Sequence, residues 1–442
     1  MCCRARGVNN RDIIERSQRA VWHPCTQMKH HELLPLVPVA RAEGAWLIDF
    51  EGNRILDAIS SWWVNLLGHG NARINQAIIT QLASLEHVML AGFTHEPVVR
   101  LSERLAALAP GNLGHCFYGS DGASAIEIAL KMSFHYWRNA GRSEKTTFIA
   151  LENSYHGETL GALSVTDVPL FRDTYAPLLR QCVRVPSPDA RRAEAGESAR
   201  AFAMRCAKAL EAHLEKYAHQ TAALIVEPLV QCAGGMAMYD QIYLREARVL
   251  CDKYAVHLIA DEIAVGFGRT GTLFACEQAG IAPDFLCLSK GLSGGYLPLS
   301  VVMTNDKVYA AFYDDRLARG FLHSHSYTGN PLACSAALAV LDILDEEQVI
   351  TRNRATAEKI NAATHFLPGH PRVENFRHCG MIWAFDVPNA PPQFAREFFD
   401  RAIAEGVLLR PLGNTVYWMP PYVLGEAEIA HFSAVLKKLM NF

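Results

Sequence analysis

The most informative stretch of the sequence reads Leu258-Ile-Ala-Asp-Glu-Ile-Ala-Val-Gly-Phe-Gly-Arg-Thr-Gly271. A short apolar run delivers two adjacent carboxylates, Asp261 and Glu262, into a loop punctuated by glycines. Ligands of open α/β sheets bind at such carboxyl ends of strands. Two explanations fit the carboxylates taken alone: an anion held against a buried cationic ring nitrogen, or a solvated turn with a salt bridge.

The next apolar run along the chain also ends in a charged residue. It reads Asp284-Phe-Leu-Cys-Leu-Ser-Lys290, and three glycines follow within five residues. A desolvated ammonium loses its proton readily, so Lys290 is a candidate Schiff-base nucleophile. A lone lysine at a strand end is usually an exposed cation, but the pairing with Asp261 one strand earlier favours the catalytic interpretation.

Short apolar runs separated by segments long enough for helices extend from about residue 114 to residue 330. This pattern is typical of a parallel sheet between layers of helices. The polar stretch 186–198 is predicted to be an exposed excursion. The clearest candidate strands are residues 147–151, 222–226, 256–260 and 285–288.

The two ends of the chain read as parts of a smaller α/β lobe. Residues 46–57 predict two short strands about a Glu51-Gly52-Asn53 turn, and apolar residues from Ile74 to Leu85 predict a long amphipathic helix. The composition shifts again near residues 346–354. We therefore expect an N-terminal lobe (1–75) that contributes to the small domain, a large cofactor-binding domain (76–345) and a C-terminal small domain (346–442).

Composition excludes several classes of function. The net charge of -3 is scattered along the chain, so neither nucleic acid nor an anionic membrane surface is an expected partner. The 12 cysteines are irregularly spaced without a Cys/His cluster, which favours reduced thiols and no metal site. No stretch resembles a signal peptide or the roughly 18 apolar residues of a membrane span, so we expect a cytoplasmic protein.

Two further segments carry candidate ligand-binding residues. Ser120-Asp-Gly-Ala-Ser-Ala-Ile-Glu127 opens a helical pattern, and free N–H groups in its first turn, at Gly122 and Ala123, can hold a phosphate. Ser120 or Asp121 can equally be a simple N-cap, and both readings share the same helix end. In Asn153-Ser-Tyr-His-Gly-Glu158, Tyr155 is suited to cover a planar cofactor, while His156 has no assigned role.

Taken in order, these segments resemble the class III, or omega, aminotransferases of fold type I, over nearly the whole chain. The resemblance implies a large domain with a mainly parallel mixed sheet sandwiched by helices, plus a small α/β domain from both termini. It also implies pyridoxal 5'-phosphate (PLP) as cofactor. The motifs that carry it are Trp22-His-Pro, Ser60-Ser-Trp-Trp63, the loop from Asp261 to Arg269, Lys290, Arg410-Pro-Leu-Gly and Met419-Pro-Pro-Tyr422.

Several site residues follow from the resemblance. Lys290 would carry the cofactor and Asp261 would pair with its pyridine nitrogen, which makes these two the expected catalytic residues. The resemblance implies a homodimer with active sites at the interface, where the segment with His325 and Ser326 reaches the partner's phosphate. The other implied cofactor contacts are Gly122, Ala123 and Tyr155, and the implied substrate contacts are Cys25, Trp62, Tyr155, Lys290, Ser324 and Arg410.

The same motifs favour a particular reaction within the class. The implied amino donor is S-adenosylmethionine and the acceptor is 8-amino-7-oxononanoate, giving 7,8-diaminononanoate in biotin biosynthesis by a ping-pong mechanism. Two positions depart from the family pattern: Cys25 replaces a substrate-contacting tyrosine, and Ala123 replaces a serine found in some members. The alternatives are another omega-aminotransferase, acting on lysine, a diamine or an omega-amino acid, and a non-catalytic PLP-binding protein.

Overall fold

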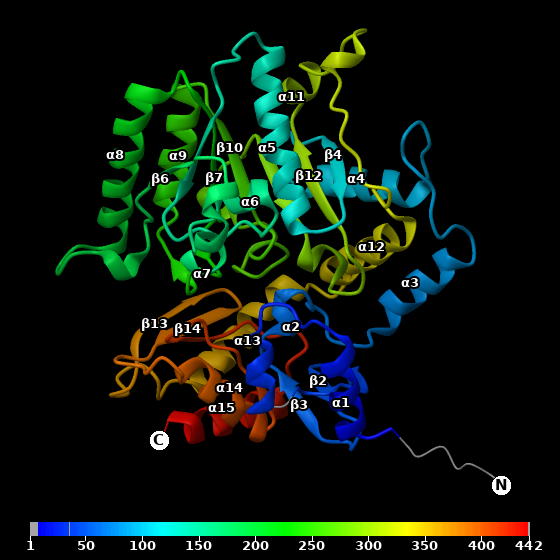
Figure 1. Cartoon of the computed structure of the whole chain (residues 1–442), viewed down its shortest axis with the longest axis vertical. Helices are drawn as coiled ribbons and strands as arrows, with labels where there is room; N and C mark the ends of the chain where they lie inside the picture. Colours follow the sequence, from blue (N-terminus) through cyan, green and yellow to red (C-terminus); the bar gives the residue numbers. More distant parts are fainter. Residues whose placement is uncertain (1–7, 35, 441–442) are drawn as a thin grey trace.

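The large domain is built on a seven-stranded sheet (Figure 1). The computed structural model of the chain describes residues 8–34 and 36–440. β12 is antiparallel to both of its neighbours, and the other pairs are parallel. In spatial order the strands are β4 (His115–Gly119), β12 (Ser300–Thr304), β11 (Phe285–Leu288), β10 (His257–Asp261), β7 (Thr221–Val226), β5 (Thr147–Leu151) and β6 (Val183–Val185).

All four predicted strands are present in this sheet. β5 and β11 have the predicted bounds, β7 begins one residue earlier, and β10 lies one residue later. Their near-continuous apolar sequences reflect burial on both faces. β4, β6 and β12 are not among the predicted strands.

Helices cover both faces of the sheet, so the domain has three layers. Alternate strand residues enter separate cores: Ile225 and Ile259 pack with α5, whereas Leu224 and Leu258 pack with α8 and α9. The helices of this part are α3 (Ala72–Leu82), α4 (Glu96–Leu108), α5 (Gly122–Asn139), α6 (Leu160–Val165), α7 (Pro169–Arg172), α8 (Ala199–Tyr217), α9 (Ile242–Lys253), α10 (Cys276–Ala279), α11 (Asp306–Ala310) and α12 (Pro331–Glu346). Short 3-10 turns are η2 (Asp173–Leu178), η3 (Ala190–Arg192), η4 (Lys290–Ser293) and η5 (Leu317–Arg319), and β8 (Val230–Gln231) pairs with β9 (Ala237–Met238).

The small domain combines both ends of the chain. β15 pairs in parallel with β3, which joins the C-terminal region to the N-terminal sheet β1-β2-β3. A second sheet has the order β13-β14-β16. The elements are α1 (Asn10–Ala20), η1 (Met28–Glu32), β1 (Arg41–Glu43), β2 (Trp46–Ile48), β3 (Arg54–Asp57), α2 (Ser60–Trp63), α13 (Val349–Ala363), β13 (Glu374–Cys379), β14 (Ile382–Asp386), α14 (Phe394–Ala404), β15 (Val407–Leu408), β16 (Thr415–Trp418) and α15 (Glu426–Met440).

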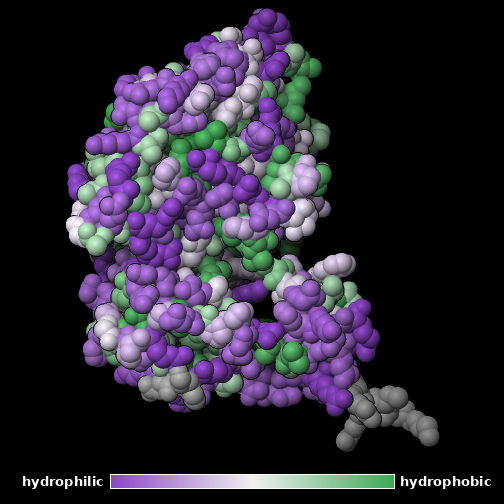
Figure 2. Space-filling model, turned by 60° about the vertical axis from the view of Figure 1, so that its left-hand side comes forward, coloured by the Kyte–Doolittle hydropathy of each residue, from purple (hydrophilic) through white to green (hydrophobic). Residues whose placement is uncertain are grey.

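The predicted α/β class, with a small domain from both termini, is confirmed, whereas the division at residues 75 and 345 stays a prediction. The hairpin at residues 46–57 is present as β2 and β3, and Gly52 turns the chain with a φ of +89°. The amphipathic helix is α3, which ends before Leu85. Hydrophilic residues cover most of the face in Figure 2, where a recess separates the two domains on one side.

The prediction that residues 186–198 form an exposed excursion is wrong for the first half of the segment. Ser187 and Asp189 are buried, and Arg191 forms ion pairs with Asp189 and with Asp386 of β14. The local pattern cannot show the pair between Arg191 and Asp386, because the two residues lie 195 positions apart in the sequence. Within the described residues, no helix is both long and apolar enough to cross a membrane.

Candidate active site

Functional side chains gather at one edge of the large sheet. Because β5, β7, β10 and β11 are parallel neighbours, their carboxyl ends meet at the same edge. Tyr155 follows β5, Glu227 follows β7, Asp261 ends β10, and Lys290 follows β11. The edge therefore brings two carboxylates and an amine together from residues that lie far apart in the chain.

Asp261 is buried and held from two sides. Its Oδ2 lies 2.7 Å from Nδ1 of His156, which is also buried, and its Oδ1 accepts from the backbone N–H of Ile263 at 3.1 Å. The His156 contact comes from the loop after β5, 105 residues away. The carboxylate is thus fixed in position, as an anion that must face a cationic ring would need to be.

Lys290 opens η4 with a left-handed φ of 43°, a conformation that a non-glycine residue seldom adopts. Its Nζ lies 4.8 Å from the centre of the Trp63 ring. Burial lowers the pKa of Lys290 below the usual lysine value, although the nearby Asp261 and Glu227 carboxylates act in the opposite direction. A lysine in such surroundings supplies a neutral amine more readily than one in water.

The two remaining carboxylates have different surroundings. Glu227 accepts hydrogen bonds from the backbone N–H groups of Tyr155 (2.9 Å) and Cys232 (3.0 Å), and burial followed by the charge of Asp261 raises its pKa to about 8. Glu262 accepts from two backbone N–H groups at residues 275 and 276, before and within α10. Glu262 therefore anchors the glycine-rich loop, while Glu227 ties the Tyr155 loop to the strand edge.

The N-terminus of α5 opens beside these carboxylates. Asp121 is the N-cap, and its side chain accepts from the N–H of Ser124 at 2.9 Å. The N–H groups of Gly122 and Ala123 lie in the first turn, where a helix provides no acceptor of its own. A Cβ at Gly122 would meet Ile263 at 3.0 Å, so glycine allows the helix to approach the loop after Asp261 closely. Both readings of this segment, as cap and as anion site, are compatible with the structure.

A second group of predicted residues lies on the small-domain side of the edge. The Arg410 guanidinium lies 4.9 Å from the Trp62 ring, and its Nη2 donates to the carbonyl oxygen of Cys25 at 3.0 Å. Burial raises the pKa of the Cys25 thiol, although the nearby Arg410 opposes this effect. The carboxylate of Glu158, which accepts from the Tyr155 hydroxyl at 2.8 Å, also acts on Cys25. Cys25, Trp62 and Arg410 therefore face the Tyr155 loop.

The tryptophan pair is held by an unusual backbone. Ser60, Ser61, Trp62 and Trp63 have φ values of 51°, 45°, 74° and 72°. Such left-handed conformations persist only where the surroundings fix them. Asp57 accepts from the Ser61 hydroxyl at 2.7 Å, and the Ser60 hydroxyl donates to the carbonyl of residue 419 at 2.8 Å.

The segment before α12 is the exception among the predicted residues. Ser324 and Ser326 are exposed, and neither hydroxyl forms a hydrogen bond with another described site residue. His325 instead lies against its own chain, with Nδ1 3.2 Å from the hydroxyl of Ser120. A contact of Ser326 with the phosphate bound by a partner requires a second chain, so it stays a prediction.

The family model "Aminotransferase class-III" matches residues 27–440. The chain belongs to the class-III aminotransferases. An adenosylmethionine-8-amino-7-oxononanoate aminotransferase of Helicobacter pylori is 46% identical over 429 residues, which cover 95% of this chain and 96% of the relative. The solved structure of an enzyme of that name from Methanocaldococcus jannaschii has a TM-score of 0.91 at 32% identity, covering 97% of this chain and 98% of that one.

A third relative bears on the cofactor of this class-III aminotransferase. It is a PLP-bound amine transaminase from an uncultivated Pseudomonas species, with a TM-score of 0.88, 30% identity and coverage of 95% and 98% of the two chains. Class-III aminotransferases depend on PLP, and the residues present fit that group: a fixed buried carboxylate, an amine with a lowered pKa and a helix N-terminus with free N–H groups. The chain is therefore a PLP-dependent aminotransferase.

Sequence reasoning missed the roles of three residues in this class-III site. His156 contacts Asp261, Glu227 binds the Tyr155 loop, and Trp63 lies under Lys290. Glu227 directly follows a predicted strand, so the rule that selected Asp261 could have selected it too. His156 and Trp63 are recognised only through contacts with distant parts of the chain.

Proposed function

We propose that this aminotransferase transfers the amino group of S-adenosylmethionine to 8-amino-7-oxononanoate, giving 7,8-diaminononanoate in biotin biosynthesis. The observation that carries the proposal is that Arg410 contacts the Trp62 ring and the Cys25 carbonyl, while Lys290 lies over Trp63, the neighbour of Trp62. The names of the relatives from Helicobacter pylori and Methanocaldococcus jannaschii support the same substrates.

The site residues divide the work of the reaction. Bound PLP supplies the electron sink that makes the substrate Cα–H acidic. Asp261, held by His156, provides the negative charge that keeps the ring nitrogen protonated. Lys290 would hold the cofactor, and its amine, with a lowered pKa, would move the proton at the substrate carbon. Gly122 and Ala123 bind the phosphate, and Tyr155 covers the ring.

Arg410 anchors a substrate carboxylate, because a planar guanidinium can donate two parallel hydrogen bonds to it. Trp62, Cys25 and the Tyr155 hydroxyl line the same space, and Ser324 adds a backbone contact. The two half-reactions use one site in turn, which gives ping-pong kinetics. Donor and acceptor therefore share the same anchoring residues.

The active enzyme is a homodimer, in which Ser326 of each chain donates to the cofactor phosphate of the other. In the single chain Ser326 is exposed, and large apolar side chains are exposed at Ile79, Leu82 and Tyr327. Exposed apolar side chains that gather on one face of a protein are expected to be covered by a partner. The cytoplasmic location expected from the sequence belongs to the same proposal.

One observation favours a second candidate, an omega-aminotransferase with another donor. Cys25 occupies a position at which related enzymes carry a tyrosine, and its carbonyl contacts the Arg410 guanidinium directly. A smaller side chain enlarges the pocket beside the carboxylate anchor. Lysine or a diamine would then be the donor, with the same role for Lys290.

A half-reaction with single donors tests the proposal. The visible absorbance of the protein-bound cofactor should be lost when S-adenosylmethionine is added without any acceptor, and should persist with lysine or putrescine. Loss with lysine or putrescine alone would transfer the function to the second candidate. Persistence with every amine would contradict both and would leave a PLP-binding protein without catalysis.

A further inference from the structure

A chain of hydrogen bonds leads from the middle of α5 back to its N-terminus. Nζ of Lys131 lies 2.8 Å from Nδ1 of His323, Nε2 of His323 lies 3.3 Å from Nε2 of His325, and Nδ1 of His325 lies 3.2 Å from Oγ of Ser120. Both histidines come from the segment before α12. Lys131 lies within α5, and Ser120 lies two residues before its first residue. The contacts therefore fasten that segment along the helix that begins at Gly122.

The direction of each hydrogen bond follows from the groups involved. An ammonium has only donors, so Lys131 must donate to Nδ1 of His323. A neutral His323 then carries its proton on Nε2 and donates to His325. His325 in turn carries its proton on Nδ1 and donates to Ser120. The hydroxyl oxygen of Ser120 is thus an acceptor in this chain, and its own hydrogen remains available to donate.

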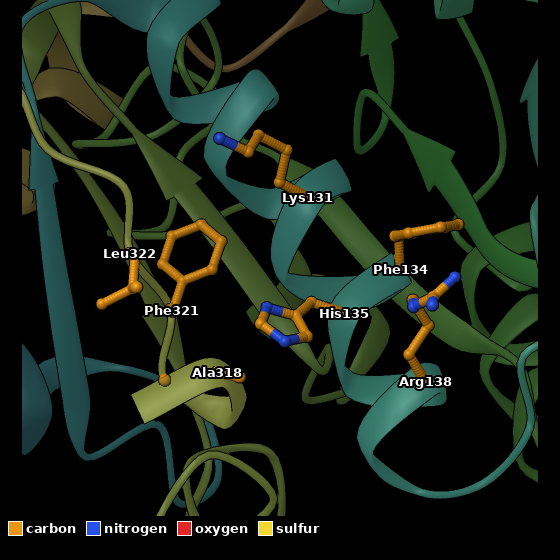
Figure 3. A pocket seen from close by; sticks show the side chains of 8 residues that line it. Lys131, Phe134, His135, Arg138, Ala318, Phe321 and Leu322 are labelled. Carbon is orange, nitrogen blue, oxygen red and sulfur yellow. The ribbon is translucent and has the colours of Figure 1, made fainter. Parts of the chain in front are cut away.

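The surroundings of His323 favour the neutral ring that this direction requires. Burial, followed by the nearby charge of Lys131, lowers the pKa of His323, and Glu127 acts in the opposite direction. The ring also stacks on Phe321, with centroids 5.7 Å apart. Lys131 lines an open pocket of about 370 Å³, in which it projects from α5 toward the segment that carries Phe321 (Figure 3). Its ammonium can therefore remain hydrated and charged while it donates to the ring.

We propose that Ser120, oriented by Lys131, His323 and His325, donates a side-chain hydrogen bond to the cofactor phosphate. This inference rests on the phosphate site proposed at Gly122 and Ala123. Ser120 is two residues before Gly122, and Oγ has no other hydrogen-bond partner among the described residues. Ala123 has no polar side chain to offer the phosphate, so the hydroxyl of Ser120 replaces a donor that is missing there. The two histidines and Lys131 are positioning residues that act through Ser120.

Cofactor affinity of the full-length apoprotein tests the role of Ser120 without any turnover. The probes are PLP and pyridoxal, which lacks the phosphate, and binding is followed by quenching of tryptophan fluorescence. Ser120→Ala should weaken PLP binding about tenfold, the loss expected for one charge-assisted hydrogen bond, and should leave pyridoxal binding unchanged. Ser120→Thr, which keeps the hydroxyl, should retain PLP affinity within about twofold. An equal loss for both probes, or no loss for PLP, would overturn the proposal.

A second set of variants tests the orienting chain. His325→Phe keeps a ring but removes both nitrogens, so it should weaken PLP binding in the wild-type background and add nothing to Ser120→Ala. His115→Phe is the matched control, because His115 contacts Asp306 and Tyr309 and takes no part in the hydrogen bonds between Lys131 and Ser120. An effect of His325→Phe that persists undiminished in the Ser120→Ala background would contradict the orienting role. The half-reaction with S-adenosylmethionine can fail while Ser120→Ala still weakens binding of PLP but not of pyridoxal. That result would contradict the proposed substrates and leave the role of Ser120 intact.

Discussion

His156 holds Asp261 through a contact of 2.7 Å between two buried side chains, and Lys290 faces them over the Trp63 ring. Asp261 and Lys290 could be predicted because each ends an apolar run, so their place at the sheet edge follows from the strands. His156 could not, because its partner lies 105 residues away and a buried histidine is more often structural. Glu227 could have been predicted in the same way as Asp261, since it directly follows a predicted strand.

Replacement of Lys290 by alanine should abolish turnover and the visible absorbance of the protein-bound cofactor together. The reason is that no other described lysine is placed at this edge of the sheet to hold the cofactor or move the proton. Steady-state assays and absorbance spectra of the same preparation provide the measurement. Turnover above the background rate in Lys290→Ala would contradict the role assigned to Lys290.

Replacement of His156 by phenylalanine should lower kcat by about tenfold to a hundredfold while the cofactor stays covalently held, because Asp261 loses the partner that fixes it. The comparison variant is His257→Phe, since His257 is equally buried but contacts Ser133 within the helix-sheet core. If kcat of His156→Phe equals that of His257→Phe, the contact with Asp261 has no catalytic consequence.

At the scale of elements, an ion cluster joins the two domains beside the site. Asp386 of β14 accepts from Arg377 of β13 at 2.9 Å and pairs with Arg191 of the large domain at 3.3 Å. It also accepts from Thr415 of β16 at 2.7 Å, and Tyr417, two residues along that strand, accepts from the Trp63 indole at 3.2 Å. The exposure of residues 186–198 was misjudged in the first half of the segment, because Arg191 pairs with a carboxylate on a strand of the other domain.

Asp386→Asn should destabilise the protein by about 3 to 5 kcal/mol, because it leaves the largely buried guanidinium of Arg377 without its carboxylate and removes one of the two carboxylates that pair with Arg191. It should also raise the KM of the acceptor more than it lowers kcat, since the cluster fixes the small domain that carries Arg410. Asp342→Asn provides the control, as its pair with Arg104 is a third exposed and lies within the large domain. Thermal midpoints and KM values that match those of the control would contradict this account.

At the scale of the whole molecule, two buried carboxyl groups at the sheet edge, Glu227 and Glu262, resist ionisation. Burial raises the pKa of Glu227 to about 8 and that of Glu262 to about 7, both above their ordinary value of 4.5. Ionisation of such groups is more costly in the folded state than in the unfolded state. Their contribution to stability is therefore fully present below pH 4.5 and is lost as the pH rises through about 7 to 8.

The thermal midpoint of the wild type should therefore fall as the pH rises from 6 to 9, and Glu227→Gln should reduce this slope. The variant itself is expected to be less stable at low pH, because an amide cannot accept both backbone hydrogen bonds that Glu227 accepts. Scanning calorimetry over this pH range measures both effects. An unchanged slope in Glu227→Gln would show that Glu227 is already ionised in the folded protein.

The substrates and the partner chain belong to this largest scale, and the sequence predicts them only through family resemblance. Arg410, Trp62 and Cys25 come from three separate segments, so the contacts between them follow from the way the chain folds. No local sequence pattern determines these contacts. The sequence alone likewise does not show which apolar residues remain exposed on the folded chain, so it does not predict the interface with a partner.

The most direct test of the proposed reaction follows the transferred atom. The purified enzyme is supplied with 8-amino-7-oxononanoate and S-adenosylmethionine labelled with nitrogen-15 at its amino group, and the products are analysed by mass spectrometry. The account predicts 7,8-diaminononanoate that carries one labelled nitrogen, in an amount that Lys290→Ala reduces to the background. Unlabelled 7,8-diaminononanoate, or none, from active PLP-loaded protein would contradict it.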